Sequence, residues 1–341
     1  MAGVGGQPRL PDLVELAWHL RQRDSARALL LASEADLASR QHVQSIDYRS
    51  GFEGRLALVR AEIELLFANM EAAQAGVEAA ARAFDEASDL VGQGDAHWLR
   101  ASIAVDRGRR DEMDACLQSA VECYRLAGDQ VRVEQVLARR LIYRAFRDPV
   151  ATDLLWRQDF PPDRTFAASV MVYVAAARGT ISKMTNDQTA SVGFYLQSYH
   201  AALDSGQIRQ AAVSLSNAVE SMVLVGDVDA ALDHGERSLT LARGTGWPGP
   251  IGLCLYRVGD VMRLLGRHAE ARDYLEESLE AMRASAGSRN YELVVSGLGQ
   301  LALDTGEADA ALEWFNEFER HARLHPEPDS LMIAWQGQAC A

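Results

Sequence analysis

The chain has 341 residues, of which 48% are hydrophobic and 24% charged, and its formal net charge is −14. This acidic balance argues against a nucleic acid as partner, because binding that polyanion requires a basic face that releases its counterions. No stretch approaches the 18 or more apolar residues that span a membrane, so a membrane is not an expected partner either.

The first third of the chain is weakly patterned. Residues 1–10 contain glycine and proline and are predicted to form a flexible leader; they lack the basic start and apolar stretch of a signal peptide, so we expect a cytoplasmic protein. Residues 11–93 are predicted to form degenerate helical hairpins. Within them, residues 41–60 are compatible with a loop or with a distorted hairpin, because serine, aspartate and glycine interrupt the apolar pattern there.

Residues 94–329 repeat with a period of about 40 residues. Gly226, Gly266 and Gly306 lie 40 apart, and an alanine follows each of them five residues later (Ala231, Ala271 and Ala311). Weaker copies of the turn position are Asn69, Gly108, Asp148 and Asn186. A repeat of this length is one helical hairpin that cannot bury its own apolar face, so several must stack into a solenoid.

Small residues mark a second position in this period, seven residues before the turn. They are Gly179, Gly259 and Gly299, with Ala101 in an earlier copy. A larger side chain where two helices cross costs about 1–3 kcal/mol by overpacking. The pattern therefore predicts close helix crossings and needs no ligand to explain it.

Residues 330–341 fall where the period places another first helix. Ala334, Trp335 and Ala339 have the character of interior positions. Two interpretations follow, a capping helix or the start of a truncated next repeat, and the interior-type residues favour the second.

No motif for phosphate binding, nucleophilic catalysis or a zinc site occurs in the sequence. His321 and His325 are spaced to share a metal, but histidines in the last turn of a helix are also favoured by its dipole. Cys116 and Cys123 are spaced as buried, reduced residues on one helix face. We therefore predict no catalytic residue, no metal ligand and no cofactor.

Basic side chains are concentrated in one helix that contains Arg139, Arg140, Arg144 and Arg147, beside Arg132. The favoured interpretation is a solvated face that pairs with acidic neighbours, and the alternative is a binding patch. Lysine occurs once, at Lys183, against 33 arginines, a skew typical of a GC-rich bacterial genome.

The small residue, the turn glycine seven later and the alanine five after that resemble the tetratricopeptide repeat family. Gly259, Gly266 and Ala271 fit this motif in one copy, and Gly299, Gly306 and Ala311 fit it in the next. The family's usual repeat of 34 residues is about six shorter. The resemblance implies an all-α, TPR-like solenoid of about seven antiparallel helix pairs that form a right-handed superhelix.

The family resemblance also indicates a binding surface, because the first helix of each hairpin lines the concave side of such a solenoid. Aromatic and polar residues at the matching positions suit a peptide, a protein or a small ligand, with a cation available for a carboxylate. Carried onto this sequence, the groove positions are Asp95, Trp98, Ser102, Tyr173, Thr180, Lys183, Ser216, Glu220, Tyr256, Asp260, Arg263, Ser296 and Gln300.

Several segments, among them Asp95-Ala-His-Trp-Leu-Arg and Gly244-Thr-Gly-Trp-Pro-Gly, look like the N-terminal repeat region of bacterial signalling proteins with a GGDEF-type diguanylate cyclase, which makes cyclic di-GMP. The resemblance implies a sensory or protein-interaction module that regulates such an output domain and that forms a homodimer if the output works as a pair. The GGDEF motif itself is absent from these residues. The alternatives are a stand-alone scaffold and the regulatory part of a transcriptional regulator or kinase.

Overall fold

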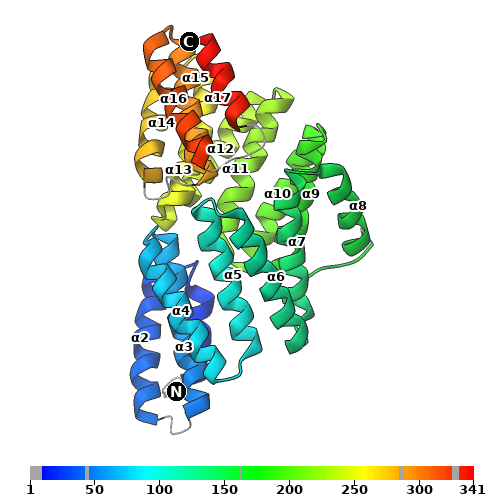
Figure 1. Ribbon diagram of the computed structural model, residues 1–341, viewed down its shortest axis with the longest axis vertical. Coiled ribbons are helices and arrows are strands. Elements are labelled where there is room, and N and C mark those ends of the chain that lie inside the picture. Colours follow the sequence, from blue (N-terminus) through cyan, green and yellow to red (C-terminus); the bar gives the residue numbers. More distant parts are fainter. Residues whose placement is uncertain (1–9, 43–45, 162, 284–287, 325–329) are drawn as a thin grey trace, which may run out of the picture. The chain divides into compact units, whose positions relative to one another are not determined.

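The computed structural model describes residues 10–42, 46–161, 163–283, 288–324 and 330–341. These residues form α-helices joined by short connections, and no strand occurs among them, which confirms the predicted all-α fold (Figure 1). The helices are α1 (Leu10–Leu20), α2 (Ser25–His42), α3 (Ile46–Leu66), α4 (Met70–Glu86), α5 (Leu90–Asp106), α6 (Arg110–Ala127), α7 (Gln130–Ala145), α8 (Pro149–Asp159), α9 (Ala168–Met184), α10 (Gln188–Ser205), α11 (Ile208–Val225), α12 (Val228–Thr245), α13 (Pro248–Leu264), α14 (His268–Met282), α15 (Arg289–Asp304), α16 (Ala308–Leu324) and α17 (Ser330–Cys340).

The chain divides into two compact units. Unit 1 comprises residues 1–103 and 115–133, and unit 2 comprises residues 104–114 and 134–341. In unit 1, α1 packs on α2 and α3 packs on α4. In unit 2, the pairs α9 and α10, α11 and α12, α13 and α14, and α15 and α16 pack in the same way.

Helices of neighbouring pairs in unit 2 also contact one another. The first helices form a continuous series in which α9 contacts α11, α11 contacts α13, α13 contacts α15 and α15 contacts α17. This series places one face of each first helix beside the next. In chain order the described helices make eight consecutive pairs followed by α17, against about seven pairs predicted.

The turns between helices explain the period. Gly226, Gly266 and Gly306 have φ values of +91°, +74° and +75°, the left-handed conformation that glycine accepts without a steric penalty. Asn186 adopts it as predicted, with φ of +64°. At the predicted Asn69 turn, the left-handed residue is instead the preceding Ala68. Asp148 is not left-handed either, since it has φ of −145°.

A shorter spacing underlies the 40-residue period. Left-handed residues recur about every 20 positions, so each helix with its turn is one unit of nearly constant length. The additional ones, halfway between the predicted turns, are Ser88, Gly128, Gly206 and Gly246.

Aspartates start several of the helices that follow these turns. The side chain of Asp148 accepts a hydrogen bond from the Ala151 backbone N–H at 2.9 Å, and Asp187 and Asp227 repeat this contact at the starts of α10 and α12. Such a cap satisfies one backbone donor that has no partner within the helix, and its loss typically costs about 1 kcal/mol. Asp148 is therefore a helix cap and not a turn residue.

Each predicted glycine crossing is closely packed. A Cβ atom added to Gly179 would lie 3.0 Å from the ring of Tyr195, one on Gly259 would lie 3.0 Å from Leu275, and one on Gly299 would lie 2.9 Å from Phe315. All three partners belong to the second helix of the same pair and are buried. The small residues therefore set the approach of the two helices, as the sequence predicts.

Substitution of Gly299 by alanine tests this crossing. The added methyl group meets the buried Phe315 ring, so we expect a loss of about 1–2 kcal/mol in unfolding free energy, even though alanine favours a helix by about 1 kcal/mol over glycine. Gly193→Ala in α10 is the matched control, because nothing lies within 4 Å of its Cβ position; it should stabilise the protein. Equal effects in urea unfolding would contradict the packing explanation.

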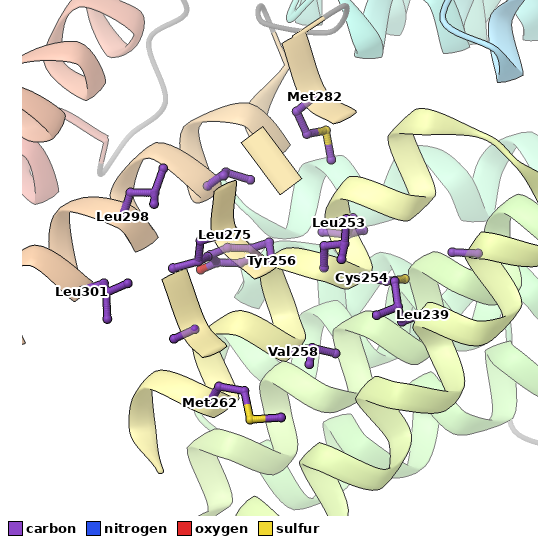
Figure 2. Close-up of a cluster of buried hydrophobic side chains, with 14 of the residues drawn as sticks. Leu239, Leu253, Cys254, Tyr256, Val258, Met262, Leu275, Met282, Leu298 and Leu301 are labelled. Atoms are coloured by element: carbon purple, nitrogen blue, oxygen red, sulfur yellow. The ribbon is translucent and has the colours of Figure 1, made fainter. Parts of the chain in front are cut away.

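A large hydrophobic cluster of unit 2 lies between α12, α13, α14 and α15 and includes Ala212 of α11. Figure 2 shows Tyr256 of α13 beside Leu275 of α14 within this cluster, with Leu253 and Cys254 farther along α13. Trp247, in the turn before α13, is also buried, with 2% exposed. Gly246 and Trp247 alone connect α12 to α13, and the prolines at 248 and 250 lie in the first turn of α13.

The last helix departs from the sequence analysis. Ala334 is buried as expected, but Trp335 and Ala339 are exposed, and the other buried residues of this helix are Ser330 and Gly337. A Cβ atom at Gly337 would lie 2.3 Å from Phe315, so this helix crosses α16 closely. No described helix is both long and apolar enough to cross a lipid bilayer.

Candidate functional site

The predicted groove residues of unit 1 belong to a charged network. Asp95 is only 7% exposed and accepts hydrogen bonds from the Tyr124 hydroxyl at 2.6 Å, from Arg132 Nε at 3.2 Å and from Arg55. Trp98 and Ser102 lie on the same helix, α5, and are half-buried. The three donors engage both oxygens of the Asp95 carboxylate, so this residue joins α3, α5, α6 and α7 within the unit.

Four predicted groove residues of unit 2 are buried. Tyr173 and Tyr256 are 8% exposed, and Thr180 and Ser216 are 1% exposed or less. The Thr180 hydroxyl lies 2.9 Å from the Ala176 carbonyl oxygen and 2.9 Å from the Tyr195 hydroxyl, so its polarity is satisfied inside the helix pair. These four side chains pack between helices and present little surface to a partner.

Lys183 and Glu220 remain partly accessible and form an ion pair between two first helices. Lys183 Nζ of α9 lies 3.1 Å from Glu220 Oε2 of α11, and Arg257 of α13 bonds the same oxygen. The exposed fractions of the three side chains are 12%, 26% and 7%. Arg257 was not among the predicted groove residues.

A sequence signal for Arg257 exists. Arg257 lies 37 residues after Glu220, and Glu220 lies 37 residues after Lys183. This spacing is about one helical turn shorter than the 40-residue repeat, and the sign of the charge alternates from one residue to the next. When first helices stack, a side chain on one helix meets a residue about one helical turn away from the equivalent position on the next helix. Residues 37 positions apart in the sequence are therefore brought together.

A second set of charges continues along α13 and α15. Arg263 donates to Asp260 at 2.9 Å within α13 and to Asp304 of α15 at 2.6 Å. Gln300 donates to the other oxygen of Asp304 at 3.2 Å, and Ser296 lies half-buried one turn earlier. Together with the ion pairs of Glu220 described above, these side chains form a set that we call the charged ladder. It consists of Lys183, Glu220, Arg257, Asp260, Arg263, Gln300 and Asp304.

The environment of the ladder sets its ionisation. The adjacent Arg257 and Lys183 outweigh the effect of burial and lower the pKa of Glu220 to about 2. Burial lowers the pKa of Lys183, although Glu220 opposes this effect. The carboxylate is therefore charged at neutral pH and shared between two cations.

Glu292 of α15 behaves in the opposite way. Its side chain is buried, with 3% exposed, and the Ser330 hydroxyl of α17 lies 3.3 Å from Oε2. Burial raises the pKa of Glu292 to about 7, although Arg289 and Arg110 act to lower it. The acid is therefore partly protonated near neutral pH, and no groove prediction included it.

This raised pKa predicts a pH-dependent stability. The folded protein holds the Glu292 proton more tightly than the unfolded chain, so between pH 4.5 and about 7 the folded state binds more protons, and its stability falls as pH rises. The penalty reaches about 3 kcal/mol above pH 8. Glu292→Gln should therefore stabilise the protein at pH 8 by that order and have little effect at pH 4.5.

Urea unfolding of both proteins at several pH values measures this difference. Glu313→Gln, an exposed position on α16, is the control, and its effect should be the same at both ends of the range. A Glu292→Gln effect that does not grow with pH would contradict the raised pKa.

Other candidate residues of the sequence analysis have ordinary surroundings. Arg140 pairs with Asp114 at 3.0 Å, and Arg132 pairs with Asp129 at 2.6 Å, which supports the predicted pairing with acidic neighbours. His321 lies 3.6 Å from Glu317, whereas His325 is outside the described residues. Among the described residues, no group of three or more metal-ligating side chains occurs.

The cysteines are free thiols. Cys254 is buried, but Cys116 and Cys123 are only half-buried, so the predicted burial of these two is partial. Cys340 is exposed.

The segment that carries the charges on α13 and α15 matches a known family. Residues 253–323, from α13 to α16, match a model described as tetratricopeptide repeat. This segment is similar to tetratricopeptide repeats (TPRs). It includes both copies of the glycine and alanine motif. A comparison with curated proteins found no match.

Solved structures share the helical arrangement at low sequence identity. A signal transduction ATPase with numerous domains from Pyrococcus horikoshii, which has a TPR sensor, is 11% identical with a TM-score of 0.51; the alignment covers 93% of this chain and 48% of that one. A Rap protein complexed with competence and sporulation factor is 9% identical (TM-score 0.49, 97% and 96% covered). Aspartyl phosphate phosphatase F from Bacillus subtilis is 12% identical (TM-score 0.49, 99% and 94% covered).

Proposed function

We propose that this chain is a TPR-type interaction module that binds a peptide or protein segment along the charged ladder. The observation that carries the proposal is the ladder itself, a set of partly exposed charges of both signs on α9, α11, α13 and α15. These helices contact one another in sequence, so the charges follow one continuous face. A partner segment that lies across several repeats meets alternating charges, which fix its register and suppress wrong partners.

The family match supports the binding role, because TPR regions act as protein-interaction scaffolds. The ladder supplies specificity more than affinity, since its charges already pair within the protein. Affinity then requires apolar contacts beside the ladder.

Peptide selection tests the proposal. A displayed library of random 12-residue peptides is selected on the wild-type chain, and the affinities of the recovered peptides are measured for two variants. Arg263→Gln removes one cation of the ladder, and Arg237→Gln removes an exposed arginine that pairs with Asp233 on α12. We expect Arg263→Gln to weaken binding about tenfold and Arg237→Gln to leave it unchanged.

Circular dichroism of both variants confirms that they remain folded. Peptides that lose affinity for Arg237→Gln and keep it for Arg263→Gln would place binding on the second helices and contradict the proposal.

The finer prediction, regulation of a diguanylate cyclase, rests on the sequence likeness alone. The descriptions of the matched family and of the three solved structures mention no GGDEF domain. The small ligand, the homodimer and the cytoplasmic location likewise stay predictions. The reading frame beyond codon 341 tests the cyclase prediction directly, because a GGDEF motif there supports it and a different output domain contradicts it.

A further inference from the structure

Exposed apolar side chains recur at the ends of three first helices in unit 2. Met184 ends α9, Leu224 and Val225 end α11, and Leu264 and Leu265 close α13. Met184, Leu224 and Leu264 lie 40 residues apart in the sequence, and their exposed fractions are 36%, 58% and 47%. We call these five side chains the apolar row.

The turns do not require apolar side chains at these positions. After α11, the Asp227 backbone N–H donates to the Met222 carbonyl oxygen at 3.0 Å, so backbone groups close the turn. The apolar contact that often accompanies such a turn joins the positions of Met222 and Asp227 and not those of the row. In α15 the equivalent exposed residues are Asp304 and Thr305, so the fold accepts polar side chains there.

Ion pairs join the three helices that carry the row. Lys183, the residue before Met184, pairs with Glu220 of α11, and Arg257 of α13 bonds the same carboxylate. Each pairing is offset by about one helical turn, so the row runs obliquely across the helices. Packed helices lie 8–10 Å apart, and the row therefore presents apolar side chains at steps of about 10 Å. It adjoins the charged ladder, because Lys183 and Arg263 each precede a row residue in the sequence.

The unpaired charge beside the row is negative. Asp187 and Asp227 cap the helices that follow α9 and α11, and Asp229 lies two residues after Asp227; all three are exposed. None of the three forms an ion pair within the part of the chain that the structure describes. The cations nearest the row are each paired with a carboxylate; they are Lys183, Arg263 and Arg267.

We propose that the apolar row binds a cationic amphipathic helix of a partner protein. An α-helix rises 1.5 Å per residue, so side chains seven positions apart lie about 10.5 Å from each other on one face and match the step of the row. An extended strand covers the same distance in about three residues, but residues at that spacing alternate between its two faces. The inference rests on the proposed function, since it supplies the apolar contacts that the charged ladder lacks.

Charge selects this partner over two others. Basic residues beside the apolar stripe of the partner meet the aspartates next to the row, an arrangement that speeds association and suppresses wrong partners. A second copy of this chain would bring the same aspartates to the row, and the anionic surface of a membrane would bring negative lipids to it. Both are repelled by the charge that attracts a cationic helix.

Titration of the full chain with a peptide of leucine and lysine tests the inference. The peptide has about 18 residues, with its leucines at the i, i+3, i+4 and i+7 positions that form one helical face. A fluorescent label reports binding through anisotropy. Two control peptides accompany it: one has the same composition with the leucines dispersed around the helix, and the other has glutamate in place of every lysine.

We expect saturable binding of the cationic amphipathic peptide and binding at least tenfold weaker for both control peptides. Leu224→Gln and Leu264→Gln should each weaken binding about tenfold, because each leucine leaves water in the complex. Asp227→Asn should weaken it about threefold and keep the helix cap, since asparagine caps as well as aspartate. Leu154→Gln, an exposed leucine of α8 outside the row, should change it less than about twofold.

Three results would overturn the inference. The first is no binding of the cationic peptide at low ionic strength, and the second is an equal loss in Leu224→Gln and Leu154→Gln, with circular dichroism confirming that both variants are folded. The third is a dimer in analytical ultracentrifugation that Leu264→Gln dissociates, which would assign the row to a second copy.

The peptides selected on the charged ladder separate this failure from that of the proposed function. Selected peptides that depend on Arg263 and not on Leu224 retain the ladder as a binding face and exclude the row from it. Binding of the designed peptide that depends on Leu224 and is unchanged in Arg263→Gln retains the row and removes the ladder.

Discussion

Asp95→Ala is expected to lower the unfolding free energy by about 3–5 kcal/mol. The carboxylate is buried and holds Arg55, Arg132 and the Tyr124 hydroxyl. Its removal leaves two guanidinium groups without their shared counter-ion and one buried hydroxyl without its acceptor, and each of these costs more than the lost bond itself.

The position of Arg55 increases this effect. Its guanidinium carbon lies 4.7 Å from the ring of Trp18 and 5.2 Å from that of Phe84, so the side chain is enclosed by aromatic rings of α1 and α4. It cannot turn into solvent without leaving these contacts, so without Asp95 its partly buried charge keeps only the longer ion pair with Asp89, at 3.9 Å. Asp95 therefore constrains the positions of these helices in addition to their hydrophobic contacts.

Chemical unfolding of the full chain, with hydrogen exchange to locate the loss, measures the effect. Protection should fall in α3, α5, α6 and the start of α7, whose residues supply the network. Glu78→Ala is the control in the same unit, because the Glu78–Arg100 pair is more exposed and contributes about 1 kcal/mol or less. If Asp95→Ala costs no more than this control, the network is not a structural element and the groove interpretation of Asp95 regains support.

The second large effect is expected from Glu220→Gln, again about 3–5 kcal/mol. Glu220 lies between Lys183 and Arg257, of which only 12% and 7% are exposed. Glutamine keeps the shape and one acceptor oxygen but leaves two cations facing each other. Lys183 lies on α9 and Arg257 on α13, with position 220 on α11 between them, so the repulsion of the two cations acts across three stacked helices.

The pH dependence of this effect identifies its electrostatic origin. The pKa of Glu220 is lowered to about 2, so its contribution is fully present above pH 4.5 and is lost as pH falls toward 2. The difference between wild type and Glu220→Gln should therefore shrink in acid. Adding Arg257→Met to Glu220→Gln should restore part of the stability, because it removes the buried charge that lost its partner.

Glu277→Gln is the matched control, since Glu277 pairs with Arg243 at the exposed surface of α14 and α12. It should leave the unfolding free energy unchanged. An acid-independent loss in Glu220→Gln would indicate a packing defect and contradict the ion-pair explanation.

The sequence predicted those features that depend on backbone geometry and helix crossing. Gly226, Gly266 and Gly306 were identifiable because few other residues accept a left-handed turn, and Gly299 because a helix crossing excludes a larger side chain. Ala68 escaped detection because alanine rarely adopts positive φ, and only the adjoining helices impose it there. The turn periodicity is therefore clearer in the structure than in the residue types.

The candidate site was less predictable. Thr180 looked like an exposed polar residue, but its hydroxyl bonds to the preceding turn of its own helix and to Tyr195, so it is buried without an unmet polar group. The pairing of Glu220 with Arg257 depends on how far one first helix is offset along the next. A 40-residue period fixes the register of each repeat but not this offset. Charges that meet across repeats thus required the packed helices.

The stacking of consecutive helix pairs also has a consequence for folding kinetics. Most helices contact the one before and the one after, so contacting residues are close in the sequence, and little loop-closure entropy opposes their meeting. Repeat arrays of this kind nucleate in one region and propagate by adding neighbours. The chain can therefore lose an outer pair to local opening while the others stay folded.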